Sequence, residues 1–334
     1  MGEKNWMNKV VFFKDIEKLS EALSTFDISR FKDESVLVKL HMGEVKNKFF
    51  IRPSFVREVV QELLHVGASP FLYDTTVLYN SPRKLVSGYK KVASLHGFNK
   101  RKIGCPVEID DEGIDVEIEG NNFEVGKTLH YQSHIICLSH VKGHIATGMG
   151  GAIKNFGMGG VTRNTKKMIH DGSKPVFKKE ACKYCGVCAE VCPFNAIKVE
   201  NDSWKVIPRS CFGCGVCVEN CPHDALSFVK DNLQYLLACS TKACVEKKHV
   251  LYINDINRIA DSCDCDSFAK NTLCEDIGYC VSLDPVAVDH ASLKLIDEVK
   301  KDVFQKTHHV DPYKQIRFGE QIGLGSTEYE LIKL

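Results

Sequence analysis

Two near-copies of one cysteine pattern constrain this chain more than any other feature. The first run contains Cys182, Cys185, Cys188 and Cys192, and the second contains Cys211, Cys214, Cys217 and Cys221. Each run has the spacing C-x2-C-x2-C-x3-C and ends on a proline, which turns the backbone away. Three thiolates spaced in this way can bind three irons of one cubane cluster. Zinc sites or disulfides are the alternative, but zinc does not need two interlocked runs of four cysteines.

The doubled pattern resembles that of bacterial ferredoxins with two [4Fe–4S] clusters. The resemblance implies that the fourth cysteine of each run completes the cluster of the other run. One cluster would then be held by Cys182, Cys185, Cys188 and Cys221, and the other by Cys211, Cys214, Cys217 and Cys192. A chain built in this way moves electrons one at a time.

The composition is that of an ordinary globular protein of about two domains, with 334 residues, 44% hydrophobic and 26% charged. A net charge of +1 gives no basis for binding nucleic acid or an acidic membrane surface. The apolar runs are shorter than the roughly 18 residues of a membrane span, and the N-terminus does not resemble a signal peptide. With 16 cysteines and no export signal, the sequence predicts a reducing cytoplasm, as in an anaerobe.

The apolar pattern of the first part predicts a parallel βαβ unit. It consists of a strand over 35–41, a helix over 53–67 and a strand over 70–74. Ligands of such sheets bind at the carboxyl ends of the strands. His41, Glu44 and Asp74 lie at these ends, and we expect His41 and Asp74 to contact a cofactor.

A strand over 134–139 is followed by a run dense in glycine, over 140–160. Glycines let the backbone approach a ligand and expose amides to an anion. A flexible loop is the alternative, but such loops are rarely so rich in His, Lys and Met. We therefore predict a ligand site in this loop. Its catalytic candidates are His140, Lys142, His144 and Lys154, and its cofactor-binding candidates are Gly148, Gly150, Gly151 and Asn155.

The predicted fold is α/β, with βαβ units around a largely parallel sheet, interrupted by an α+β ferredoxin-like domain with two clusters. Residues 1–176 and 232–334 would form the two parts of the α/β domain, and 177–231 the insertion. The returning part would contain a strand over 249–260 and a long helix from Asp284-Pro285 to about residue 305.

Several separate stretches resemble the DUF362 iron–sulfur proteins. They are residues 38–44, 139–144, 150–155, 263–265, 276–278 and 282–287. The resemblance implies an oxidoreductase with a ferredoxin module and an unassigned substrate.

A second resemblance is to the nickel-pincer lactate racemases. The matching positions are His144, Gly148, Gly151, Lys154 and His170. In that family the lysine tethers a pyridinium-derived nickel cofactor, the last histidine binds nickel and the first is an acid/base residue. The family's second acid/base histidine follows the second strand of its βαβ unit, and residues 73–79 here contain no histidine. The resemblance therefore implies a shared fold and ligand pocket with different chemistry, and it adds His170 to the catalytic candidates.

The motif Cys263-Asp264-Cys265 has three competing explanations. The two thiols could join Cys274 in a third metal or iron–sulfur site, because thiolates select soft metals. They could form a dithiol that accepts electrons, or they could be small buried apolar residues. The last explanation is the one expected for Cys105, Cys137, Cys239 and Cys244.

The leading functional hypothesis is a ferredoxin-type oxidoreductase that reduces or activates a small anionic substrate or a bound metal or organic cofactor. His140 and His144 would move protons, and Lys142 or Lys154 would hold a carboxylate or phosphate. Two alternatives stay open. In the first, the chain is an electron-transfer or maturation protein that serves a redox partner protein. In the second, it is a racemase-like enzyme with a nickel cofactor on Lys154.

Overall fold

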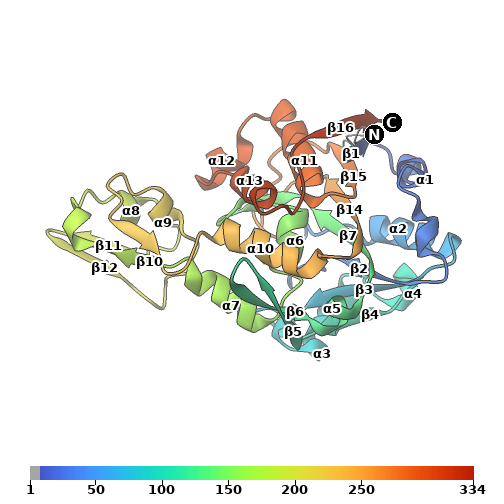
Figure 1. The fold of residues 1–334 in the computed structure, drawn as a ribbon, viewed down its shortest axis with the longest axis horizontal. Helices are drawn as coiled ribbons and strands as arrows, with labels where there is room; N and C mark the ends of the chain where they lie inside the picture. The colour runs from blue at the N-terminus through green and yellow to red at the C-terminus, as the bar shows by residue number, and fades with distance from the viewer. Residues whose placement is uncertain (1–7) are drawn as a thin grey trace, which may run out of the picture.

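The computed structural model describes residues 8–334, built around a sheet in the order β16-β1-β15-β14-β7-β2-β3-β4 (Figure 1). Neighbouring strands run parallel except on both sides of β15, so the sheet is mostly parallel, as predicted. The strands are β1 (Asn8–Phe13), β2 (Ser35–Lys39), β3 (Ser69–Thr75), β4 (Val107–Asp110), β7 (His134–His140), β14 (His249–Ile256), β15 (Gly278–Ser282) and β16 (Tyr329–Lys333).

The predicted βαβ unit is confirmed, since α2 (Pro53–His65) connects the parallel strands β2 and β3. Pro53 occupies the first turn, where a missing N–H costs no hydrogen bond. The helix buries an apolar stripe that includes Phe55, Val59 and Leu63. Gly67 follows the helix with a φ of +86°, a conformation that favours glycine.

Helices cover both faces of the sheet, and the alternation of side chains along the strands sorts them into two cores. In β2, Val36 and Val38 belong to one core and Leu37 to the other. The first core is covered by α1 (Leu19–Ser24), α2, α3 (Val86–Leu95) and α4 (Lys100–Ile103). The second is covered by α5 (Lys127–Tyr131), α6 (Ala152–Gly157), α10 (Leu233–Val245), α11 (Pro285–Val299) and α13 (Lys314–Gln321).

Residues 175–228 form a small lobe, here called the cysteine lobe, which projects from the body at the left of Figure 1. Its elements are β10 (Pro175–Phe177) paired with β13 (Leu226–Phe228), β11 (Ile197–Glu200) paired with β12 (Ser203–Val206), α8 (Val187–Glu190) and α9 (Val216–Glu219). The lobe has a core of its own around Ile197, Cys217 and Leu226. The large sheet takes strands from both sides of the lobe in the sequence. The domain boundaries themselves remain predictions.

The glycine-rich run is not one loop, and this part of the expectation was wrong. Strands β8 (Lys142–His144) and β9 (Gly148–Gly150) form a short hairpin, and α6 follows at once. Helix α7 (Arg163–Gly172) then leads to the cysteine lobe, packing near the hairpin of β5 (Gly113–Ile118) and β6 (Asn121–Gly126).

Two boundaries in the returning part differ from the sequence prediction. The strand predicted over 249–260 ends at Ile256. The long helix ends at Val299, and a separate helix, α12 (Val303–His308), begins after Asp302, which has a left-handed φ of 56°. That conformation interrupts the helical hydrogen bonding. No helix of residues 8–334 combines the length and the apolar character that crossing a membrane requires.

Candidate functional site

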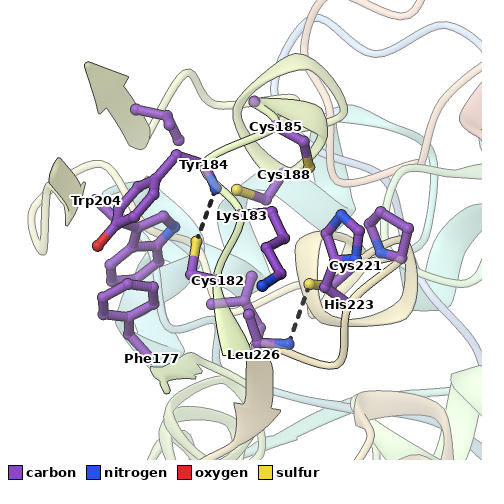
Figure 2. Close-up of a pocket in the computed structure, with 14 residues that line it drawn as sticks. Phe177, Cys182, Lys183, Tyr184, Cys185, Cys188, Trp204, Cys221, His223 and Leu226 are labelled. Atoms are coloured by element: carbon purple, nitrogen blue, oxygen red, sulfur yellow. Dashed lines mark hydrogen bonds between the residues drawn. The ribbon is translucent and has the colours of Figure 1, made fainter. Parts of the chain in front are cut away.

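The cysteine lobe contains two cavities, and each takes three cysteines from one run and one from the other. The first is a small, partly open cavity (Figure 2). The cysteines in its lining are Cys182, Cys185, Cys188 and Cys221. Figure 2 also shows Trp204 and Phe177 beside the cavity, stacked with ring centroids 4.6 Å apart. Thiols and apolar side chains therefore dominate this lining.

The second cavity is of similar size and lies nearer the body. Its cysteines are Cys192, Cys211, Cys214 and Cys217. Phe194 and Phe212 also line it, with centroids 5.0 Å apart. The structure thus groups the eight cysteines into the two sets that the sequence predicted as cluster ligands.

Backbone amides donate to several of these sulfurs. The N–H groups of Tyr184, Ala196 and Ala225 donate to Cys182, Cys192 and Cys221 at N···Sγ distances of 3.3, 3.2 and 3.3 Å. Such bonds stabilise a thiolate and tune the potential of a cluster that it holds. Within residues 8–334 no two cysteines are joined by a disulfide.

No three His, Cys, Asp or Glu side chains in the described chain are arranged as ligands of one metal ion. In a cubane cluster each thiolate binds a different iron, so the four sulfurs surround the cluster and do not meet at one point. Four thiols around a cavity fit this geometry better than they fit a single zinc ion, whose ligands share one centre.

Outside the lobe, the end of β7 and the β8–β9 hairpin bring two catalytic candidates, His140 and Lys142, against Asp264. The His140 Nδ1 and Asp264 Oδ1 atoms are 2.8 Å apart, and Lys142 Nζ lies 3.1 Å from Asp264 Oδ2. Burial alone would raise the pKa of the Asp264 carboxyl, but His140 and Lys142 outweigh burial and lower it. All three side chains are buried, so the Asp264 carboxylate holds His140 and Lys142 in place.

The two thiols that flank Asp264 share a hydrogen bond. This bond, together with the charges of Lys154 and Lys142, lowers the pKa of Cys263 to about 5, although burial opposes the change. The same bond and burial raise the pKa of Cys265. One thiolate and one thiol therefore share a proton next to two lysines.

The charge of Lys154 acts both on this thiol pair and on two histidines. Burial and then the charge of Lys154 lower the pKa of His144, and the same two causes lower the pKa of His170 to about 4. A Cβ atom at Gly150 would lie 3.4 Å from both Lys142 Cε and Lys154 Cδ, so both lysine side chains pass this glycine. We call Lys142, Lys154, His144, His170, Cys263 and Cys265 the thiol–lysine cluster.

His144 is held as a neutral ring. The Ala146 N–H donates to His144 Nδ1 at 3.2 Å, so the ring carries its proton on Nε2. The Thr147 hydroxyl lies 3.0 Å from the same Nδ1 atom. His170 differs, because its buried Nδ1 has no partner among the described residues. The first histidine can donate a proton, and the second has a nitrogen free for a ligand.

Other cofactor-binding candidates are engaged within the protein. The Asp74 carboxylate accepts from Lys39 Nζ at 2.9 Å and from the Tyr89 hydroxyl. Lys39 also donates to Asn155 Oδ1 at 2.8 Å, and Asn155 Nδ2 donates to the Leu138 carbonyl at 2.9 Å. These contacts connect β2, β3, β7 and α6, so they fix the helix that carries Lys154.

His41 belongs to a neighbouring charged network. Its Nε2 atom lies 2.9 Å from an Arg83 nitrogen, and burial and that guanidinium lower its pKa. Arg83 also lies 3.4 Å from the Glu44 carboxylate. Tyr79 and Ser81 donate hydroxyl hydrogen bonds to Glu44, each at 2.9 Å. The candidate His41 is thus held beside the Arg83 guanidinium within the protein.

Two of the candidate glycines allow close packing. At Gly151 a Cβ would lie 2.4 Å from Asp289 Oδ1, the carboxylate that accepts from the first amides of α6. Gly148 has a φ of +69°, and its Cβ would lie 2.8 Å from the Val310 carbonyl oxygen. Both glycines are needed for the protein's own packing.

A family model matches residues 36–294 of the chain and is described as DUF362, a domain of unknown function. The chain belongs to this family. No match was found among curated proteins. Two solved structures are similar to it at low identity. One is a Thermotoga maritima protein from a structural genomics consortium, with 11% identity and a TM-score of 0.43, covering 92% of this chain. The other is the lactate racemase apoprotein of Thermoanaerobacterium thermosaccharolyticum, with 10% identity and a TM-score of 0.43, covering 90%. This chain spans 59% of the length of each.

The DUF362 chain connects the cysteine lobe to the thiol–lysine cluster through α7. The rings of His170 and Phe212 have centroids 4.3 Å apart, and a Cβ at Gly213 would lie 1.9 Å from the His170 carbonyl oxygen. Cys214 packs against the small core that contains Ile169. The second cysteine cavity is therefore the one that faces the cluster.

The remaining cysteines of the DUF362 chain lie elsewhere. Cys105, Cys137, Cys239 and Cys244 are buried, as expected. Cys274 packs at the edge of the large core, and burial raises its pKa, with Lys300, Glu275 and Asp276 as its charged neighbours. The third metal site formed by Cys263, Cys265 and Cys274 stays a prediction.

Sequence reasoning did not single out several residues of this site. Lys39, Arg83 and Asp289 are all buried and charged. Lys39 had a signal, because it interrupts the apolar strand Val36-Leu37-Val38. Asp289 also had one, since it stands among apolar residues in α11. Arg83 had none, because it lies in a polar loop.

Proposed function

We propose that this DUF362 protein is an iron–sulfur oxidoreductase of the cytoplasm. The cysteine lobe would hold two [4Fe–4S] clusters, and the thiol–lysine cluster would be the place where a small anionic substrate reacts. The observation that carries the proposal is the sorting of eight cysteines into two cavities. The amide hydrogen bonds to Cys182, Cys192 and Cys221 add support, because cluster thiolates need donors.

Each cluster would supply one electron at a time, at low potential. The second cavity packs against His170 through Phe212, so its cluster would be the one next to the reaction site. The first cavity, which contains Cys185, would take electrons from a redox partner protein, since Cys185 is exposed. Electrons would therefore pass from the partner to the first cavity, then to the second cavity, and then to the substrate.

The residues of the body would bind the substrate and manage protons. Lys154 is absent from the ion pairs of the described residues, whereas Lys39 and Lys142 both have acidic partners. Its charge is therefore available to an anion. His144 carries its proton on Nε2 and would donate it to a reduced substrate. His140 and Lys142 would hold Asp264 in place and so fix the thiols on both sides of it.

A second candidate function is supported by the environment of Lys154. This amine lies near two neutral histidines, and His170 Nδ1 has no partner among the described residues. These groups fit a cofactor attached to Lys154 with His170 as a metal ligand. The mass of the intact protein distinguishes the two functions, because an attached cofactor adds mass that disappears in Lys154→Arg.

Metal analysis of anaerobically purified protein tests the leading proposal. Two [4Fe–4S] clusters require about eight irons and about eight acid-labile sulfides per chain. A broad visible absorption that bleaches with dithionite is expected with them. Zinc in place of iron, or about four irons per chain, would contradict the two-cluster proposal.

A further inference from the structure

We propose that Cys263 and Cys265 form a redox-active dithiol–disulfide couple that receives two electrons from the cysteine lobe and reduces the disulfide bond of a small anionic substrate. The supply of electrons rests on the proposed function of the lobe, whereas the chemistry of the pair does not. The substrate class would thus be small anionic disulfides, and the cysteine pair would be the group that contacts them.

Contacts of Asp264 and a turn of the backbone hold the two thiols close together. The Asp264 carboxylate is bound by His140 and Lys142, and its carbonyl oxygen accepts from the Glu44 N–H at 2.9 Å. Asp264 is fully buried, and it lies in a turn that the Asp266 N–H closes by donating to the Cys263 carbonyl oxygen at 2.8 Å. The Cys265 N–H lies 3.4 Å from Cys263 Sγ, and the two thiols share a hydrogen bond. They are therefore positioned to form a bond with little movement.

The charges around the pair suit an anionic partner. Lys154 and Lys142 both act on the pair, and Cys265 is partly exposed. By contrast, Cys105 and Cys137 are buried, and burial raises their pKa values to about 11 and about 12. Reactive thiols occur in electropositive, partly exposed surroundings, and Cys265 meets this description because it is partly exposed and the charge of Lys154 acts on it.

The reaction balances without another reagent. A thiolate of the pair attacks one sulfur of the substrate disulfide and forms a mixed disulfide, releasing one substrate thiolate that takes up a proton. The second cysteine loses its proton and attacks its partner's sulfur, which releases the second substrate thiolate and closes the Cys263–Cys265 disulfide. Two electrons and two protons reopen this bond, with one electron from each reduced cluster of the lobe.

The test uses the cluster-containing protein under anaerobic conditions with glutathione disulfide, which is anionic, and cystamine, which is cationic. After alkylation and digestion with trypsin, residues 259–270 form one peptide that contains Cys263 and Cys265 and no other cysteine. We expect glutathione disulfide to convert this peptide from the doubly alkylated form to an unalkylated disulfide form, two hydrogens lighter than the free dithiol, at least about tenfold faster than cystamine does at low salt. The adjacent peptide, 271–294, contains Cys274 and Cys280 and should stay reduced.

Variants separate the pair from its surroundings. Cys265→Ser removes the second thiol, so glutathione should stay attached to peptide 259–270 as a stable mixed disulfide. Lys154→Gln should reduce the preference for the anionic probe, whereas Lys90→Gln, at an exposed ion pair with Glu108, should not change it. Unoxidised wild-type peptide, or equal rates with both probes, would overturn the proposal.

Reduction of the Cys263–Cys265 disulfide tests the connection to the cysteine lobe. Oxidised protein whose clusters are then reduced by an external ferredoxin should return peptide 259–270 to the dithiol form. A disulfide that persists in protein with a full complement of reduced clusters would overturn the proposal. Failure of the proposed function would look different, because iron would be missing while the pair still reacted with glutathione disulfide.

Discussion

Lys39→Met should destabilise the protein far more than the same change at a surface lysine. Lys39 is completely buried and lies 2.9 Å from Asp74, whose side chain is 2% exposed. Removing one partner of a buried ion pair costs about 3–5 kcal/mol, because the other charge stays buried. Lys90 also has an acidic partner, Glu108 at 3.0 Å, but the two side chains are 43% and 50% exposed. There the same substitution should cost at most about 1 kcal/mol.

These energies convert into melting temperatures. An unfolding entropy of about 2.1 cal/mol/K per residue, applied to 334 residues, gives about 0.7 kcal/mol/K. Lys39→Met should therefore lower Tm by about 4–7 °C, and Lys90→Met by about 1 °C or less. Circular dichroism of anaerobically purified proteins measures both. The double variant Lys39→Met/Asp74→Asn should regain part of the loss, since it also removes the buried Asp74 charge, which keeps only the longer 3.8 Å ion pair with Arg83. Equal shifts for the two single variants would refute the reasoning.

Two further predictions concern α6 and the residues near it. Burial raises the pKa of Asp289 from 3.8 to about 6, so its stabilising contribution is complete below about pH 4 and is lost as the pH rises through about 6. Between about pH 5 and about pH 8 the free energy of unfolding should fall by about 1.4 kcal/mol, or about 2 °C in Tm, and Asp289→Asn should not show this fall. A variant whose Tm falls with pH in parallel with that of the wild type would contradict this. Lys154→Ala and His144→Ala should each lower turnover at least about a hundredfold without altering the cluster spectrum. Full activity in both variants would contradict the proposed reaction site and favour the electron-carrier function.

The sequence was most informative where a pattern is local. The βαβ unit was predictable because strand alternation, helical spacing and Pro53 all lie within one short stretch. The two cysteine runs were recognisable for the same reason, since each carries its own spacing, whereas the exchange of the fourth cysteine between them followed from the resemblance to ferredoxins. The glycine-rich run was wrongly predicted to be a loop. The pairing of Lys142 with Gly150 depends on backbone hydrogen bonds, and glycine has a low strand propensity that gives no signal for them.

The charged networks were not predictable, because their members meet only in the folded chain. Arg83 reaches Glu44 and His41 from a separate loop, and Asp289 caps a helix more than a hundred residues earlier in the sequence. The break after Val299 also lacks a local signal, since no proline or glycine stands between α11 and α12. Long-range pairing of buried charges therefore determines much of this site.

The spectrum of Cys192→Ser tests the central claim most directly. Cys192 belongs to the first run in sequence but lines the cavity of the second run. The account predicts that electron paramagnetic resonance of reduced Cys192→Ser will match that of Cys214→Ser, with the first-run cluster intact. A spectrum that instead matches Cys185→Ser, with the second-run cluster intact, would contradict the proposed arrangement of the two clusters.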